Sequence, residues 1–142
     1  MFIRRSITDV LMRRAKNSRG LLLTGPRQVG KSTLLKHNYP GVKYFTFDDQ
    51  VLLASATEDP KLFLKNIPKP SILDEVQYAK DLFPYIKIEC DKDERYENYY
   101  LTGSQQMKLM AKAKESLAGR VSILVHAGDQ RHRLQSSLRS DR

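Results

Sequence analysis

The sequence predicts an α/β fold in which a parallel sheet of five strands carries helices on both faces. Short apolar runs closed by turn residues alternate along the chain with segments of helical periodicity, and this alternation is typical of parallel sheets. The length of 142 residues fits one domain, for which about 100–200 residues is usual. The predicted strands are Leu21–Thr24, Val42–Phe47, Ser71–Leu73, Tyr99–Thr102 and Val121–Val125.

The first predicted helix is basic and lies within residues 1–20. Its apolar side chains, among them Ile7, Leu11 and Ala15, recur close to the helical period. Further helices are predicted between the strands, where Pro, Gly and Asn residues mark their ends. These helical segments are Ser32–His37, Val51–Ala56, Lys61–Asn66, Leu82–Cys90 and the stretch from Met107 to about Gly119.

Three parts of the chain differ in composition. Residues 1–20 form the basic helix, residues 21–125 contain the alternating strands and helices, and residues 126–142 form a polar, Arg-rich tail. The tail has no aromatic residue, and its large apolar side chains from Asp129 onward are Leu134 and Leu138. Because so little surface can be buried there, we expect the tail to be disordered.

The net charge of +9 is concentrated at the two ends of the chain. Residues 1–20 contain six basic residues and one acidic residue, and residues 129–142 contain four arginines and two aspartates. Basic ends of this kind can bind nucleic acid. The competing interpretation is a solvated helix face followed by a polar tail, which is favoured because neither basic segment has interleaved aromatic residues.

Several classes of protein are excluded by composition. No apolar run approaches the roughly 18 residues of a membrane span, and the N-terminus lacks the apolar stretch of a secretory signal. A single cysteine, Cys90, excludes a disulfide framework and a cysteine-based zinc site. We therefore expect a cytoplasmic protein without a membrane partner.

The strongest motif is GPRQVGKS, which follows the first predicted strand and begins a helix. It fits the pattern of Gly, four residues, then Gly-Lys-Ser or Gly-Lys-Thr that binds nucleotide phosphates. Backbone N–H groups of such a loop surround the phosphates, and Lys31 would place its charge on the β and γ phosphates. The Ser32 hydroxyl would bind Mg²⁺. The predicted nucleotide-binding residues are Gly25, Pro26, Arg27, Gln28, Val29, Gly30, Lys31, Ser32 and Thr33.

A second motif, SILDE, places two carboxylates at the end of another apolar strand. Asp74 would hold Mg²⁺, and Glu75 would orient and activate the attacking water as a general base. Acids also commonly end strands and begin turns. The position of this pair on a separate strand after the glycine-rich loop favours the catalytic interpretation.

Two further sites carry alternatives. In YYLTGS either Ser104 or Thr102 could sense the γ-phosphate, or both could satisfy turn backbone groups. In ESLAGR, Arg120 could reach a γ-phosphate in its own subunit or in a neighbour. Otherwise it interacts with the dipole at the end of a helix.

The motifs together resemble the AAA-like P-loop ATPase domain of a large bacterial and archaeal family, in which a nuclease-like domain of unassigned function usually follows. The resemblance covers roughly residues 3–125. It implies a P-loop NTPase sheet in which the Tyr99–Thr102 strand separates the Asp74 strand from the glycine-rich loop. It also implies ATP, Mg²⁺ and hydrolysis, and assigns function to Lys31, Ser32, Asp74 and Glu75. The strings that carry it are GPRQVGKSTLL, YFTFDD, ILDEVQ, LFPYIK, LTGSQ and ESLAGRV.

The sequence departs from that family after Val125, so we expect the family's C-terminal part to be missing. The predicted function is an ATPase with catalytic residues Lys31, Glu75, Ser104 and Arg120, and with low activity in this chain. The alternatives are an ATP-binding switch without turnover, a nucleic-acid-binding protein, and a small-molecule kinase. The partner is ATP, and assembly into a homo-oligomer stays open.

Overall fold

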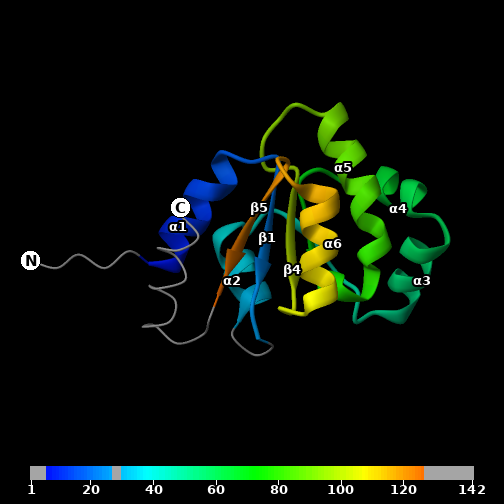
Figure 1. The fold of residues 1–142 in the computed structure, drawn as a ribbon, viewed down its shortest axis with the longest axis horizontal. Helices are drawn as coiled ribbons and strands as arrows, with labels where there is room; N and C mark the ends of the chain where they lie inside the picture. Colours follow the sequence, from blue (N-terminus) through cyan, green and yellow to red (C-terminus); the bar gives the residue numbers. More distant parts are fainter. Residues whose placement is uncertain (1–5, 27–29, 127–142) are drawn as a thin grey trace, which may run out of the picture.

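A computed structural model describes residues 6–26 and 30–126 of the chain. The strands are β1 (Gly20–Thr24), β2 (Lys43–Thr46), β3 (Ser71–Asp74), β4 (Tyr99–Gly103) and β5 (Val121–Val125). They form one sheet in the order β2-β3-β4-β1-β5, and every neighbouring pair is parallel. The predicted sheet is confirmed, and β4 separates β3 from β1. Figure 1 shows β4 beside β1.

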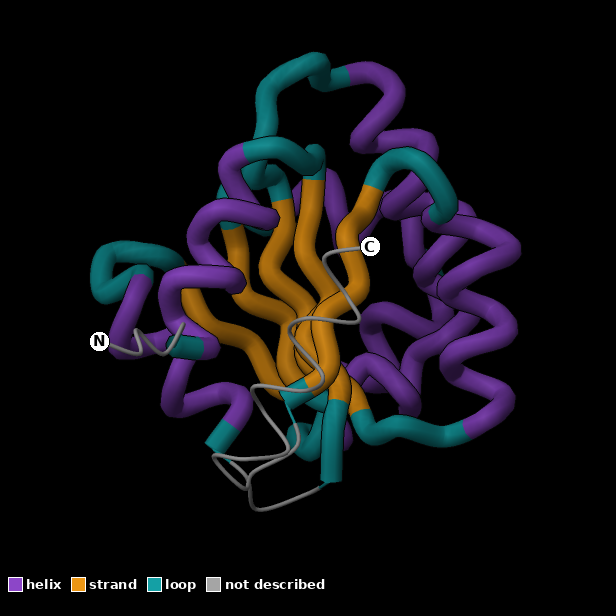
Figure 2. Tube along the Cα trace, turned by 60° about the vertical axis from the view of Figure 1, so that its left-hand side comes forward, coloured by secondary structure: helices purple, strands orange, loops and turns teal. Residues whose placement is uncertain are grey.

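Helices cover both faces of this sheet (Figure 2). The helical elements are α1 (Ile7–Lys16), α2 (Lys31–Asn38), α3 (Gln50–Glu58), α4 (Pro60–Asn66), the 3₁₀ helix η1 (Val76–Leu82), α5 (Phe83–Lys92) and α6 (Met107–Leu117). The sequence predicted all of them within a few residues except η1, whose residues show no clear period. The predicted tail, residues 126–142, lies outside the described residues from 127 onward.

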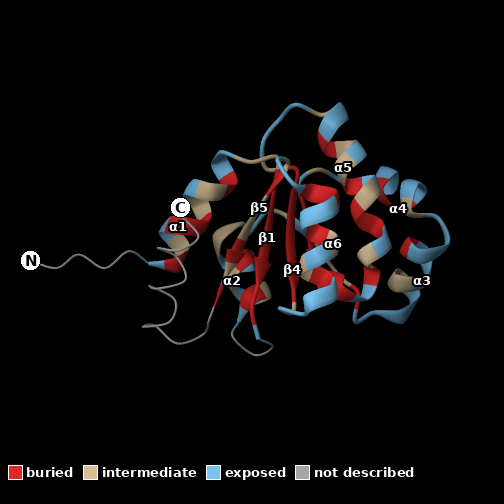
Figure 3. Ribbon diagram, in the orientation of Figure 1, coloured by how far each residue is buried: buried red, intermediate tan, exposed pale blue. Residues whose placement is uncertain are grey.

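The core divides into two layers because side chains alternate along each strand. Leu21 and Leu23 of β1 belong to the layer beneath α1 and α2. Leu22, between them, belongs to the opposite layer, which contains residues of α3, α4, η1, α5 and α6. All three leucines are fully buried, as Figure 3 shows for the central strands. A strand buried on both faces explains the continuous apolar run in the sequence.

Local capping sets where several helices begin. Ser6 caps α1 by accepting a hydrogen bond from the Asp9 amide. Asp49 accepts from the amides of Val51 and Leu52 at the start of α3, and Asp59 caps α4. Side-chain oxygens at these positions bind amides that the first helical turn leaves unpaired. The helices therefore begin where short polar residues precede apolar ones.

Candidate functional site

The loop after β1 depends on two glycines. Gly25 has φ of 152°, and a Cβ atom on it would lie 2.1 Å from the carbonyl oxygen of His126. Gly30 has φ of 81° and lies in the left-handed region directly before α2. Only glycine adopts such backbone geometry at little cost. The loop can therefore curl tightly from the end of β1 into the first turn of α2. Arg27, Gln28 and Val29 lie outside the described residues.

Lys31 is the first residue of α2, and its side chain is only 5% exposed. Its Nζ atom donates to the carbonyl oxygens of Gly25 at 2.9 Å and Pro26 at 2.8 Å. The ammonium group therefore lies against the backbone carbonyl groups at the start of the glycine-rich loop. Ser32 and Thr33 follow it in the first turn of α2, whose N-terminal amides favour an anion.

Asp74 ends β3 and is held by the two strands that flank it. Its Oδ2 atom accepts a hydrogen bond of 2.5 Å from the Tyr44 hydroxyl of β2, and its Oδ1 atom accepts one from the Thr102 hydroxyl of β4. Burial and then the hydrogen bond to Asp74 raise the pKa of Tyr44, while the Ser32 side chain opposes the rise.

Glu75 is fixed at its backbone by the same threonine. Its φ of 62° lies in the left-handed region, which is sparsely populated by residues other than glycine. The Glu75 N–H donates to the Thr102 hydroxyl oxygen at 3.0 Å. Thr102 therefore joins the two acidic residues, since its hydroxyl donates to Asp74 and accepts from Glu75.

The side chain of Glu75 is held by a residue for which the sequence predicted no role. Gln77 donates from Nε2 to Glu75 Oε2 at 2.9 Å, and its Oε1 accepts from the Ser104 N–H at 3.2 Å. Gln77 and Glu75 are 5% and 9% exposed. The sequence signal that could have indicated Gln77 was a glutamine two residues after the paired acids. Tyr44 was missed because a strand sequence does not show which side chain of the neighbouring strand reaches Asp74.

Ser104 and Thr102 have different surroundings. The Thr102 hydroxyl binds both acidic residues. Within the described residues, the Ser104 hydroxyl is buried and has no hydrogen-bond partner. A buried polar group without a partner is rare in proteins and calls for an explanation. Of the two residues predicted to sense a phosphate, only Ser104 has a hydroxyl that is not already bound to protein.

Arg120 lies at the opposite end of the sheet. It directly precedes Val121, which is paired with Gly20 at the start of β1, whereas the glycine-rich loop follows Thr24 at the end of β1. Five residues of strand span roughly 16 Å. Arg120 Nε donates to Asp91 Oδ1 at 2.9 Å. This placement corrects the prediction that Arg120 could act on a phosphate in its own subunit, because the length of the strand separates Arg120 from the loop.

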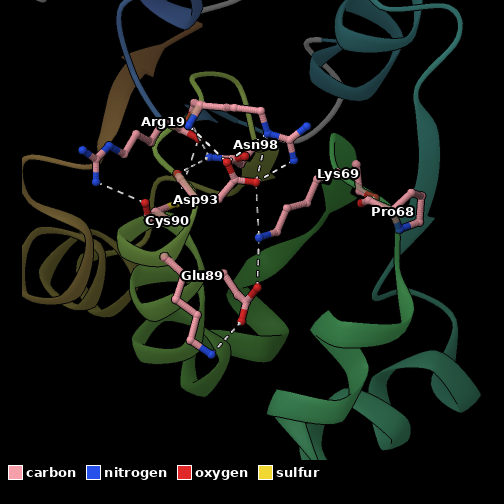
Figure 4. Close-up of polar contacts among 10 residues, drawn as sticks. Arg19, Pro68, Lys69, Glu89, Cys90, Asp93 and Asn98 are labelled. Carbon is pink, nitrogen blue, oxygen red and sulfur yellow. Dashed lines mark hydrogen bonds and ion pairs between the residues drawn. The ribbon is translucent and has the colours of Figure 1, made fainter.

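A second polar cluster lies at the end of the sheet where the strands begin (Figure 4). Lys69, just before β3, approaches Glu89 at 2.9 Å and Asp93 at 3.8 Å. Arg19 donates to the Cys90 carbonyl oxygen at 3.1 Å. Arg95 holds the pKa of the Asp93 carboxyl below its usual range. These contacts bind the end of α5 to the starts of β1 and β3, so the cluster holds elements together.

The described residues contain no group of three or more His, Cys, Asp or Glu side chains that could hold a metal ion by themselves. A cation at Asp74 would therefore need oxygen ligands from elsewhere, such as Ser32, water and a bound phosphate. Mg²⁺ usually keeps several such ligands. The hydroxyl and carboxylate present fit this hard cation.

No helix within the described ranges is both long and apolar enough to cross a membrane. Residues 17–127 match a family model described as an AAA domain. Two uncharacterized proteins, one from Mycobacterium bovis and one from Mycobacterium tuberculosis, are each 35% identical to the chain over 130 residues. The match covers 90% of this chain and 30% of each relative. The chain thus spans about 30% of the length of these curated relatives.

Proposed function

The chain belongs to the AAA domain family of ATP-binding domains, and on this premise we propose that it hydrolyses ATP in the presence of Mg²⁺. The geometry around Thr102 carries the proposal. One buried hydroxyl fixes both Asp74 and Glu75, and the neighbouring Ser104 hydroxyl is buried with no partner among the described residues. Two oriented carboxylates and an available hydroxyl are the groups that phosphoryl transfer to water requires.

The glycine-rich loop would bind the phosphates of ATP. Its backbone amides and the N-terminus of α2 favour negative charge, and Lys31 adds a full positive charge beside the Gly25 and Pro26 carbonyl groups. Ser32 and Asp74 would hold Mg²⁺, which supplies charge neutralisation at the phosphate oxygens when bound. Thr33 and the loop residues from Pro26 to Gly30 complete the proposed contacts.

Glu75 would act as the general base. Its carboxylate is fixed by Gln77, and its backbone is fixed by Thr102, so it can accept a proton from a water molecule at a defined position. Ser104 would donate its hydroxyl hydrogen bond to the γ-phosphate. That contact would satisfy the hydroxyl that the protein leaves unpaired.

Arg120 would act only on the nucleotide of a neighbouring copy, in a homo-oligomer. An arginine that reaches the transferred phosphate contributes about 10³–10⁵ in rate. Because a strand length of roughly 16 Å separates Arg120 from the glycine-rich loop of its own chain, one chain alone lacks this contribution. We therefore propose slow turnover for the isolated chain.

The proposal is tested by measuring ATP binding and ATP turnover on the same samples. Lys31→Ala should lose most of the thermal stabilisation by ATP·Mg²⁺, because a ligand stabilises the fold less as its dissociation constant rises toward the ligand concentration. Glu75→Gln should keep that stabilisation and lose turnover. Lys114→Ala removes a lysine from the exposed face of α6 and serves as the control. Parental stabilisation in Lys31→Ala would contradict the binding site, and parental turnover in Glu75→Gln would contradict the base.

A second candidate function is an ATP-binding switch without turnover. It is favoured by the ion pair that holds Arg120 on Asp91, at 2.9 Å, far from the loop. In that case ATP·Mg²⁺ would stabilise the parent chain, but no phosphate would be released at any protein concentration. The turnover measurement therefore separates the two functions.

A further inference from the structure

Gln77 uses both ends of its side-chain amide on the two residues that flank the proposed reaction. Nε2 donates to the Glu75 carboxylate at 2.9 Å, and Oε1 accepts the backbone N–H of Ser104 at 3.2 Å. Gln77 is only 5% exposed. The glutamine thus connects η1, the acidic end of β3 and the turn after β4.

The chemistry of the two partners fixes which way the amide faces. A carboxylate only accepts hydrogen bonds, and a backbone N–H only donates them. The amide of glutamine supplies both a donor for the carboxylate and an acceptor for the N–H. Rotating the amide by 180° would place its oxygen against the Glu75 carboxylate and its NH₂ group against the Ser104 N–H. A carboxylate in place of the amide would keep the acceptor for Ser104 but lose the donor for Glu75. A thioether would lose both.

The absence of a side chain at Gly103 leaves space for the Gln77 amide. Gly103 lies between Thr102 and Ser104, and a Cβ atom there would be 2.7 Å from Leu109 Cδ2 and 3.5 Å from Gln77 Oε1. A side chain at Gly103 would therefore crowd α6 and contact the amide. The close approach of β4 to η1 and α6 is what brings the Ser104 N–H to Gln77.

The hydrogen bond to Glu75 matters because the backbone of Glu75 is already fixed. Thr102 holds the Glu75 N–H at 3.0 Å, so the side-chain torsions are the remaining freedom of the carboxylate. Gln77 restricts that freedom at Oε2. A general base must lie within hydrogen-bond reach of the water that it activates, and a displacement of about 1 Å can cost about 100-fold in rate.

We infer that Gln77 is a positioning residue that aims the Glu75 carboxylate and couples it to the Ser104 turn. This inference rests on the proposed function, since it assigns Glu75 the role of base. Through Gln77 the base and the hydroxyl proposed to contact the γ-phosphate are held in one hydrogen-bonded unit. A shift of the Ser104 turn would therefore be transmitted to the carboxylate.

Two substitutions of similar size separate the two hydrogen bonds. Gln77→Glu keeps an acceptor for Ser104 but removes the donor to Glu75, and Gln77→Met removes both. Gln50→Met makes the same change on the exposed start of α3 and is the matched control. Thermal unfolding with and without ATP·Mg²⁺ is recorded for every variant, so a loss of folding or of binding is seen directly.

Steady-state kinetics of the full chain give the first readout. Both Gln77 variants should lose about 10- to 100-fold in kcat, with the KM for ATP within about twofold of the parent, and Gln50→Met should keep the parental kcat. In a Glu75→Gln background, Gln77→Met should not lower the residual turnover any further, because its effect passes through Glu75. A parental kcat in both Gln77 variants, or an equal loss in the Glu75→Gln background, overturns the inference.

Amide NMR gives a readout that does not depend on turnover. The Ser104 backbone resonance should stay in place in Gln77→Glu and move in Gln77→Met, and the Gln77 side-chain NH₂ resonances should move in Glu75→Ala. Unmoved resonances overturn the inference. If the parent chain releases no phosphate, or if Glu75→Gln keeps the parental turnover, the proposed function fails. The NMR result then decides by itself whether Gln77 connects Glu75 to Ser104.

Discussion

At the scale of single residues, Thr102 organises the candidate site. It lies on β4 between the acidic strand and the strand of the glycine-rich loop, and it is fully buried. Its hydroxyl donates to the Asp74 carboxylate and accepts from the Glu75 N–H. A single hydroxyl thus satisfies one carboxylate oxygen and the amide of a residue in an unfavourable backbone conformation. Valine, which has nearly the same shape, offers neither function.

Thr102→Val should therefore lower both stability and nucleotide binding. Valine has nearly the same shape, so the main change is a buried amide and a buried carboxylate oxygen that each lose a partner, at a cost of about 1–3 kcal/mol. Urea unfolding measures the loss. Thr57→Val, at an exposed position on α3, should change stability by less than about 0.5 kcal/mol. A Thr102→Val protein as stable as this control would show that the hydroxyl is not needed.

At the scale of elements, the polar cluster around Lys69 fastens α5 to the start of β3. Lys69 is 18% exposed and lies between Glu89 and Asp93, which are each 20% exposed. Lys92, on the same helix, also approaches Glu89 but is 62% exposed and 4.0 Å away. Partly buried ion pairs contribute more than exposed ones because water and salt screen them less.

Lys69→Met should destabilise the protein by about 1 kcal/mol or more, since two carboxylates would lose their common cation in a partly buried position. Lys92→Met should leave stability within about 0.5 kcal/mol of the parent. The free energy of unfolding of both variants is measured by chemical denaturation at low and high salt. Equal effects of both substitutions would contradict a bridging role for Lys69.

The thiol of Cys90, within α5, predicts a pH dependence. Burial raises the pKa of this thiol to about 11, whereas an unfolded cysteine ionises near pH 8.5. The neutral thiol therefore contributes its full stability below about pH 8.5 and loses it as the pH rises toward 11, by about 1.4 kcal/mol per pH unit at most. Urea midpoints between pH 8 and 10 should fall more steeply for the parent than for Cys90→Ala. An equal dependence of the urea midpoint on pH in the parent and in Cys90→Ala would contradict a raised pKa for the Cys90 thiol.

At the scale of the whole molecule, the sheet separates the predicted catalytic residues into two ends. The glycine-rich loop and both acidic residues lie where the strands end, and Arg120 lies where β5 begins, on Asp91. Arg120 can therefore meet a phosphate only if another chain brings one to it. The proposed role of Arg120 in catalysis therefore predicts slow turnover by a single chain and faster turnover in an assembly.

Turnover per chain should rise with protein concentration, and Arg120→Ala should abolish the rise while keeping ATP binding. The expected gain is large, because an arginine at the transferred phosphate is worth about 10³–10⁵ in rate. Phosphate release over a wide range of chain concentrations is the measurement, with sedimentation recorded in parallel. Rapid turnover that depends on neither concentration nor Arg120 would contradict a role between chains.

The sequence by itself determined the features that depend on neighbours along the chain. Apolar runs predicted the central strands β1, β3 and β4, because a strand buried on both faces is apolar throughout. The alternating aromatic residues of Val42–Phe47 predicted β2, which contains no buried residue. The apolar residues of Val121–Val125 predicted β5, which is partly buried. Glycine spacing and the following lysine predicted the phosphate loop, because Gly25 and Gly30 need backbone conformations that other residues resist. The short helix η1 was not predicted, since a 3₁₀ segment with a kink at Ala79 has no regular apolar period.

Only the tertiary structure decided which distant residues meet. The crossover that places β4 between β3 and β1 brings Thr102 onto Asp74 and Glu75, and the packing of η1 brings Gln77 to Ser104. Strand polarity likewise places Arg120 far from the loop of its own chain. Hydrogen bonds between side chains depend on strand order and register, and neither is written in the local pattern of residues from which strands and loops are predicted.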